Sequence, residues 1–261
     1  MDGNAILQWT ENGRIWLADA DYIKSLPKYH NTMLILKDGQ SQKIPGFCEL
    51  QNIADLPTLA AARSALKNYA GVDWHRYVIW PKGRFFLVID QMRANEEDDY
   101  SFRAVWQTIG QVSQEDSNLD INQKDQHARF AMTADLRCIL TDDPATGKNW
   151  GSYPFKTDPV VRVFQGIANT HLAPGAQANI FTALEASGEQ ASEIVTTRLA
   201  DNAVAVTGAG EPRVAIVPDA EGRISIPNML DAEADLIVIT PERGYAVGVR
   251  EASFMGYAET F

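Results

Sequence analysis

Short apolar runs separated by turn-forming residues repeat along most of this chain. The runs are rich in β-branched and aromatic side chains, and a turn signal follows at intervals of ~8–12 residues, which is typical of an antiparallel sandwich or barrel. In the second half, the predicted strands span residues 160–167, 179–186, 193–199, 203–206, 213–217, 236–240 and 245–250. The pattern therefore predicts an all-β protein.

The clearest hairpin lies in the first half of the chain. Residues 76–80 and 85–92 are apolar or aromatic on both faces, which predicts a central strand pair that is covered on both sides. Two segments depart from the strand pattern. The alanines and leucines of residues 54–70 predict a short helix, and the polar residues 111–126 predict a long surface loop.

A second hairpin places polar residues at the ends of a strand. Residues 32–36 form an aliphatic run, and Asp38-Gly39 is a strong turn signal. His30 and Asn31 precede this strand, and Gln42 follows the turn. Strand ends often carry binding groups. A histidine before a strand is also a common surface or capping residue, so the pattern alone leaves its role open.

Composition limits the partners that the chain can bind. The 261 residues are 45% hydrophobic, which suits one large globular domain. The net charge of −11 argues against a nucleic-acid surface, although a local basic cluster remains compatible with it. No apolar run reaches the ~18 residues of a membrane span. The first residues lack the basic start and apolar core of a signal peptide.

The two cysteines, Cys48 and Cys138, are far apart and form no CxxC motif. Both stand in apolar, strand-like surroundings. Two buried thiols are therefore the default interpretation, and their pairing stays open.

Two blocks of residues resemble a known family. The first is Tyr29-His30-Asn31-Thr32, an aliphatic strand, then Gly39 and Gln42. The second is Trp74-His75-Arg76-Tyr77, a turn, and a strand that ends at Asp90. Together, over about residues 10–110, they resemble the C-terminal β-sandwich of heparinase II/III-like polysaccharide lyases. The strand between His30 and Gly39 is about one residue longer than in the family pattern.

The resemblance implies a large antiparallel two-sheet β-sandwich, supersandwich-like, with at most one or two short helices. Residues 1–261 would form this one domain, and a composition shift near residue 200 indicates that residues ~200–261 pack on it as a smaller terminal sheet. The resemblance also favours an internal fragment of a longer parent protein that is periplasmic or secreted.

The resemblance implies a role in β-elimination on an acidic, uronic-acid-containing polysaccharide or oligosaccharide. His30 and Asn31 are the candidate catalytic residues. Tyr29, Gln42 and Arg76 are the candidate substrate-binding residues. In the family the main acid and base belong to an α-helical toroid domain, which this chain lacks. The chain is therefore expected to supply one wall of the active cleft and to be inactive alone. The alternative is a non-catalytic carbohydrate-binding or structural module.

Two further hypotheses concern the histidines and Arg76. Some family members hold a structural zinc with two histidines and a carboxylate, so His30, His75 and Glu49 are candidate zinc ligands. Asp38 and Asp55 compete with Glu49 for the acidic position. Arg76 and Asp90, on adjacent strands, also fit a buried ion pair, which we favour over a substrate role for Arg76.

Overall fold

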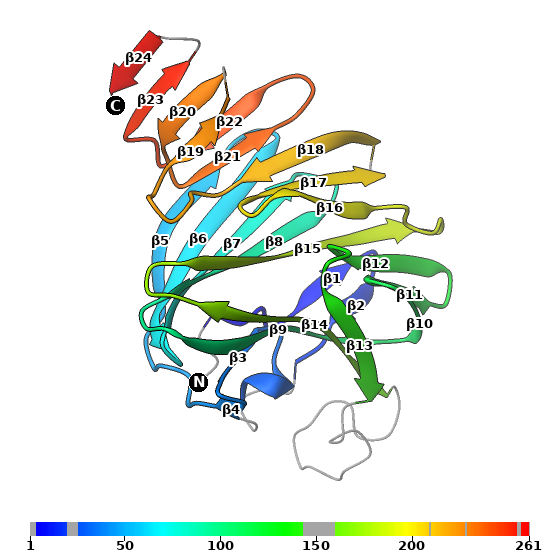
Figure 1. The fold of residues 1–261 in the computed structure, drawn as a ribbon. Coiled ribbons are helices and arrows are strands. Elements are labelled where there is room, and N and C mark those ends of the chain that lie inside the picture. The colour runs from blue at the N-terminus through cyan, green and yellow to red at the C-terminus, as the bar shows by residue number, and fades with distance from the viewer. Residues whose placement is uncertain are drawn as a thin grey trace.

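The computed structural model describes residues 4–19, 26–142, 160–208, 210–227, 229–254 and 257–260. Regular structure in these residues consists of antiparallel strands and one short 3-10 turn, η1 Pro27–Tyr29 (Figure 1). The prediction of an all-β antiparallel sandwich is confirmed. In the same residues, no helix is long and apolar enough to cross a membrane.

An eight-stranded antiparallel sheet forms the centre of the molecule. In spatial order its strands are β10 Gln111–Glu115, β11 Asn118–Gln123, β12 Gln126–Met132, β15 Gln177–Gly188, β8 Phe86–Ala94, β7 Val72–Pro81, β6 Leu59–Tyr69 and β5 Glu49–Asp55. Side chains alternate between the two faces of a strand. On β7, for example, Trp74 is buried in one core, and Tyr77 is buried in another on the opposite face.

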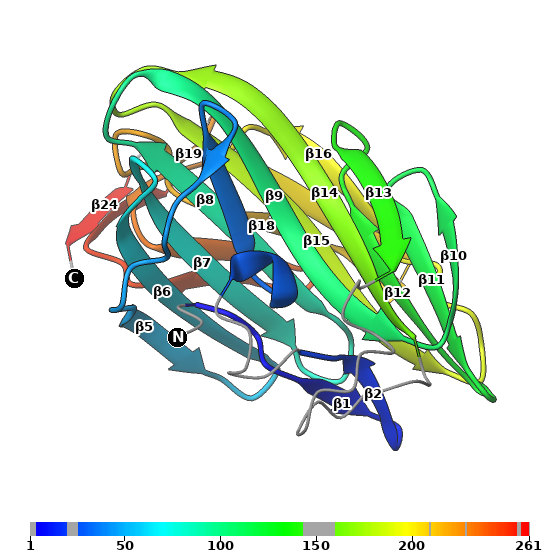
Figure 2. The same cartoon turned by 90° about the horizontal axis from the view of Figure 1, so that it is seen from below.

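A five-stranded sheet covers one face of the central sheet. Its strands are β13 Arg137–Asp142, β14 Val161–Leu172, β9 Asp98–Ile109, β3 Met33–Lys37 and β4 Gln40–Ser41. The hairpin of β1 Trp9–Glu11 and β2 Arg14–Leu17 adds Trp16 to the core between the sheets. Figure 2 shows that the smaller sheet crosses the central one diagonally and leaves β5 outside the overlap.

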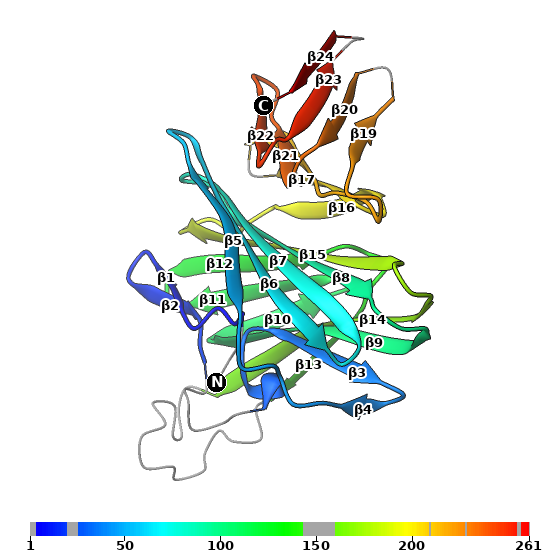
Figure 3. The ribbon, with the colours of Figure 1, turned by 90° about the vertical axis from the view of Figure 1, so that its left-hand side faces the viewer.

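A second five-stranded sheet packs on the opposite face. Its strands are β16 Val195–Ala200, β17 Ala203–Gly208, β18 Gly210–Ile216, β21 Leu236–Ile239 and β22 Gly244–Val247. A last sheet consists of β19 Ile224–Ile226, β20 Leu230–Glu233, β23 Glu251–Phe254 and β24 Tyr257–Thr260. Figure 3 shows these sheets stacked above the central one, so that the sandwich carries further layers at its C-terminal end.

The helix predicted for residues 54–70 is wrong. This segment forms the end of β5, a turn and β6, and β6 pairs with β5 on one side and β7 on the other. Alanine favours a helix over other residues by only ~0.5 kcal/mol each. Two hydrogen-bonded ladders and the burial of Leu59, Ala61 and Leu66 outweigh that preference.

The long loop predicted for residues 111–126 is also wrong. Strands β10 and β11 fill it, and β12 begins at its end. Leu119 and Ile121 are buried, and the residues that alternate with them point to the opposite, polar face. Only one face of β11 is apolar, so the strand contains few apolar residues. Their alternation is short, and the sequence therefore resembles a polar loop without a period.

The hairpin that contains His30 and Asn31 is confirmed. Asp38 and Gly39 both adopt positive φ, 49° and 73°, as a two-residue hairpin turn between β3 and β4 requires. His30 and Asn31 precede β3 and are separated from it by Thr32. The cysteines Cys48 and Cys138 are half-buried free thiols.

Candidate functional site

His30 lies at the entrance to β3 and is held by the 3-10 turn before it. Its backbone N–H donates to the carbonyl of Pro27 at 3.0 Å. The residue is 1% exposed, and its Nδ1 lies 2.9 Å from Oδ1 of Asp19. A carboxylate only accepts hydrogen bonds, so this contact places a proton on Nδ1 and fixes the orientation of the ring.

Asn31 joins the N-terminal segment to β9. Its amide nitrogen donates to the carbonyls of Ile6 at 3.0 Å and Ala18 at 2.7 Å, and its side-chain oxygen accepts from the backbone N–H of Gln107 at 2.6 Å. The side chain is fully buried. These three hydrogen bonds give Asn31 a structural role, and its catalytic role stays a prediction.

Arg76 is buried beneath the same N-terminal segment. Its Nε and Nη2 donate to the two carboxylate oxygens of Asp90 at 2.7 and 3.0 Å. Its Nη1 donates to the carbonyls of Asn4 at 2.9 Å and Asn31 at 3.0 Å. The ion-pair hypothesis is confirmed. The substrate-binding hypothesis for Arg76 gains no support, because the guanidinium is only 2% exposed.

The other two predicted substrate-binding residues lie on either side of β3. Tyr29 is half-buried in η1, and Nζ of Lys28 lies 5.0 Å from the centroid of its ring. Gln42 is exposed just after β4, at the far end of the hairpin. The structure therefore brings His30, Asn31 and Arg76 into one cluster and leaves Gln42 outside it.

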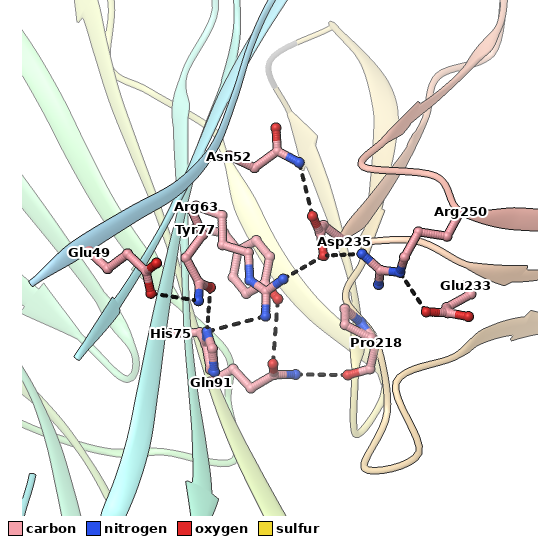
Figure 4. A network of polar contacts seen from close by, with 11 residues as sticks. Glu49, Asn52, Arg63, His75, Tyr77, Gln91, Pro218, Glu233, Asp235 and Arg250 are labelled. Atoms are coloured by element: carbon pink, nitrogen blue, oxygen red, sulfur yellow. Dashed lines mark hydrogen bonds and ion pairs between the residues drawn. The ribbon is translucent and has the colours of Figure 1, made fainter. Parts of the chain in front are cut away.

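His75 belongs to a different cluster (Figure 4). It neighbours Arg76 on β7, so the two side chains lie on opposite faces of the central sheet. Its Nδ1 lies 3.2 Å from Nη2 of Arg63 and 3.1 Å from Oε1 of Gln51. Burial, and then the positive charge of Arg63, lower the pKa of His75 to about 4. The imidazole is therefore neutral at pH 7.

The three predicted zinc ligands do not come together. His30 contacts Asp19, whereas His75 lies on the other face of the central sheet. Glu49 reaches His75 only through Gln51, whose Nε2 donates to Oε2 of Glu49 at 3.3 Å. Among the residues that the structure describes, no group of three or more His, Cys, Asp or Glu side chains is placed to hold a metal ion.

Sequence analysis missed two carboxylates that organise these clusters. One is Asp19, which is a partner of His30. Asp235 accepts from Nη1 of Arg63 at 2.5 Å and from Nδ2 of Asn52 at 2.9 Å, and so joins β5 and β6 to the C-terminal sheets (Figure 4). The sequence does contain a signal for Asp235. It directly precedes the apolar run of residues 236–239, which predicts a buried strand, and a carboxylate at the edge of a buried strand needs a hydrogen-bonding partner.

An exposed apolar surface lies on the same face of the central sheet as Arg76. Side chains that stand opposite each other on paired strands lie on the same face of the sheet. By this pairing, Leu50, Ile53 and Trp80 lie on the face of Arg76. Their exposed fractions are 64%, 69% and 37%. We call these three residues the β5–β7 apolar surface.

Comparison with known proteins relates this geometry to a fold. No family model and no curated protein matches the sequence. A mutant of the heparan sulfate lyase HepC from Pedobacter heparinus matches 96% of this chain with a TM-score of 0.56 and 13% identity. A heparinase III, the BT4657 gene product, matches 97% with a TM-score of 0.57 and 10% identity. Another heparinase III structure matches 95% with a TM-score of 0.56 and 11% identity.

The fold is that of a heparinase III-like sandwich. The resemblance that we inferred from two short blocks of residues is thus confirmed at the level of the fold. The chain spans only 36% of the length of the HepC structure and 35% of each heparinase III structure. Most of the length of each of those lyase chains therefore has no counterpart in this heparinase III-like sandwich.

Proposed function

We propose that this chain forms one wall of the active cleft of a polysaccharide lyase that cleaves a uronic-acid polymer by β-elimination, and that His30 is the residue it contributes. The fold carries this proposal, because structures of heparan sulfate lyases match 95–97% of the chain. A periplasmic or secreted location follows from the proposal, since polymeric substrates do not pass through membranes.

The His30–Asp19 pair suits the chemistry of elimination. A base removes the proton α to the uronate carboxylate, and an acid protonates the leaving glycosidic oxygen. The intermediate resembles an enolate, so its carboxylate must be neutralised by hydrogen bonds or positive charge. Nδ1 of His30 lies 2.9 Å from Asp19. A protonated His30 would then donate from Nε2 to the carboxylate of the uronate.

The β5–β7 apolar surface supports the need for a second domain. Leu50 and Ile53 expose about two thirds of their surface on an edge strand, where a soluble module would normally carry polar residues. We propose that an α-helical toroid domain packs against this surface and supplies the remaining catalytic groups. The isolated chain is then inactive.

A second candidate function is a structural sandwich without catalytic groups. The burial of the His30 cluster favours it, because His30, Asn31 and Arg76 are at most 2% exposed. In that case the His30–Asp19 contact only fixes the N-terminal segment against β3.

One experiment separates the two functions. The chain is assayed with and without an α-toroid domain, on heparan sulfate and alginate, by following the absorbance of unsaturated uronate at about 235 nm. Elimination is expected only with the toroid present. His30→Ala should lower kcat by a factor on the order of 10², with the thermal melt recorded to verify folding.

His171→Ala is the matched control, because His171 is an exposed histidine on β14 whose side chain is 57% exposed. It should leave the elimination rate unchanged. Full activity in a folded His30→Ala variant would establish the structural function instead. Absence of elimination from every uronate polymer would reject the lyase proposal.

A further inference from the structure

The outer face of β10, β11 and β12 carries a regular array of polar side chains. Strand pairing aligns them in two neighbouring rows, which are Gln111–Asn122–His127 and Ser113–Asp120–Arg129. The opposite face of the same strands carries Leu119, Ile121 and Phe130, which are buried in the core. The array therefore lies on the face that the second five-stranded sheet covers elsewhere in the molecule.

This array lines a hollow of about 400 Å³. Ala191 and Ser192, from the segment between β15 and β16, complete its wall. Pockets for small ligands have volumes of roughly 300–1,000 Å³, so the hollow has room for a ligand about the size of one sugar ring.

The first row keeps its hydrogen-bonding capacity available. In the part of the chain that the structure describes, no hydrogen bond involves the side chains of Gln111, Asn122 or His127. Asn122 and His127 are only partly exposed. Amide side chains both donate and accept hydrogen bonds, and the two ring nitrogens of an imidazole can do the same. Hydroxyl groups also do both, so a polyol matches this row.

The second row excludes an anionic ligand. Nε and Nη2 of Arg129 donate to the two oxygens of Asp120 at 2.6 and 2.9 Å. Glu185 stands opposite Arg129 on β15, so one positive charge faces two negative charges. Ser192 in turn donates to Glu185. A sulfate or uronate placed here would meet net negative charge.

We propose that this hollow binds one neutral sugar residue through Asn122 and His127. The site is separate from the His30 cluster and needs no toroid domain, so its occupancy does not depend on the lyase proposal. The hollow would bind a neutral sugar residue and would repel an acidic polymer, because Asp120 and Glu185 carry more charge than Arg129 alone.

Binding to the whole chain can be followed by NMR titration and calorimetry. The probes are neutral gluco-, manno- and galacto-oligosaccharides and a uronate hexasaccharide. We expect one neutral series to bind and to shift the amide signals of β10–β12. Loss of one or two neutral hydrogen bonds in Asn122→Ala or His127→Ala should weaken the affinity by about tenfold.

Asn169→Ala is the matched control, since Asn169 is an exposed asparagine on β14 outside the hollow. It should bind as the unmodified chain does. Three outcomes would overturn the proposal: no binding of any neutral series, unchanged affinity in both Asn122→Ala and His127→Ala, or preference for the uronate hexasaccharide.

Discussion

Arg76 and Asp90 form a two-hydrogen-bond ion pair inside the sandwich, with side chains that are only 2% and 1% exposed. The guanidinium carbon of Arg76 lies 4.9 Å from the ring centroid of Trp74 and 5.4 Å from that of Trp106. The indole nitrogen of Trp74 also donates to Asp90 at 2.8 Å. The pair thus connects the central sheet, the smaller sheet and the N-terminal segment.

Asp90→Ala should lower the free energy of unfolding by about 3–5 kcal/mol, because it leaves the Arg76 charge buried without a partner. The combined replacement of Arg76 by Met and Asp90 by Leu should cost less, since it removes both charges together and leaves only neutral groups unpaired, the carbonyls of Asn4 and Asn31 and the indole N–H of Trp74. Urea denaturation of the three proteins measures the difference. A loss of less than about 1 kcal/mol in Asp90→Ala would show that water solvates the Arg76 guanidinium and that the ion pair is not buried.

Gly248 occupies a site where no side chain fits. Its φ is +63°, and an added Cβ would lie 2.6 Å from Nδ2 of Asn52 and 2.7 Å from Cγ of Asp235. Gly83 has a similar φ of +72° and open space around it. Both alanine variants carry the cost of a left-handed backbone, about 1–2 kcal/mol. Gly248→Ala should lose on the order of 2 kcal/mol more, because it also disrupts the Asp235 contacts.

Equal melting temperatures for Gly248→Ala and Gly83→Ala would show that the Asp235 contacts adjust freely. A selective loss in Gly248→Ala would instead show that the packing of the C-terminal sheets on β5 and β6 depends on Asp235 and its neighbours.

The two thiols should react slowly. Burial raises the pKa of Cys48, and burial together with the charge of Asp135 raises the pKa of Cys138 to about 11. Only the thiolate attacks iodoacetamide, so alkylation of Cys138 at pH 8 should be at least about tenfold slower than for a free cysteine, and that of Cys48 should also be slowed. Mass spectrometry follows the reaction, and unfolding in guanidinium should restore the full rate. Rapid labelling of the folded protein would contradict the burial of Cys138.

Local patterns predicted the β3–β4 hairpin and the β7–β8 hairpin, because their turns and two-residue periods lie within a few neighbouring residues. The same reasoning failed for β6, where pairing with β5 and β7 overrides the helix preference of alanine. It missed Asp19 as the partner of His30 and Asp235 as the partner of Arg63. Arg63 and Asp235 are 172 residues apart, and only the folded chain brings them together.

His75 should make stability depend on pH in a defined window. Its folded pKa of about 4 lies below the value of about 6.5 for an unfolded histidine, so between these values the unfolded chain binds the proton more strongly. Stability is therefore complete above about pH 6.5 and falls as the pH decreases toward 4. At about 1.4 kcal/mol per pKa unit, the loss approaches about 3 kcal/mol.

His75→Gln should flatten the pH dependence of urea denaturation in this window, because glutamine cannot bind the proton and its oxygen can still accept from Arg63. The charges around His75 are those of Arg63, Lys67, Asp73 and Asp235. The control is His171→Gln, since contacts with Asp99 and Glu97 raise the pKa of that exposed histidine. His171 stabilises the fold at low pH, so its loss cannot flatten the curve. An unchanged slope in His75→Gln would assign the effect to the carboxylates.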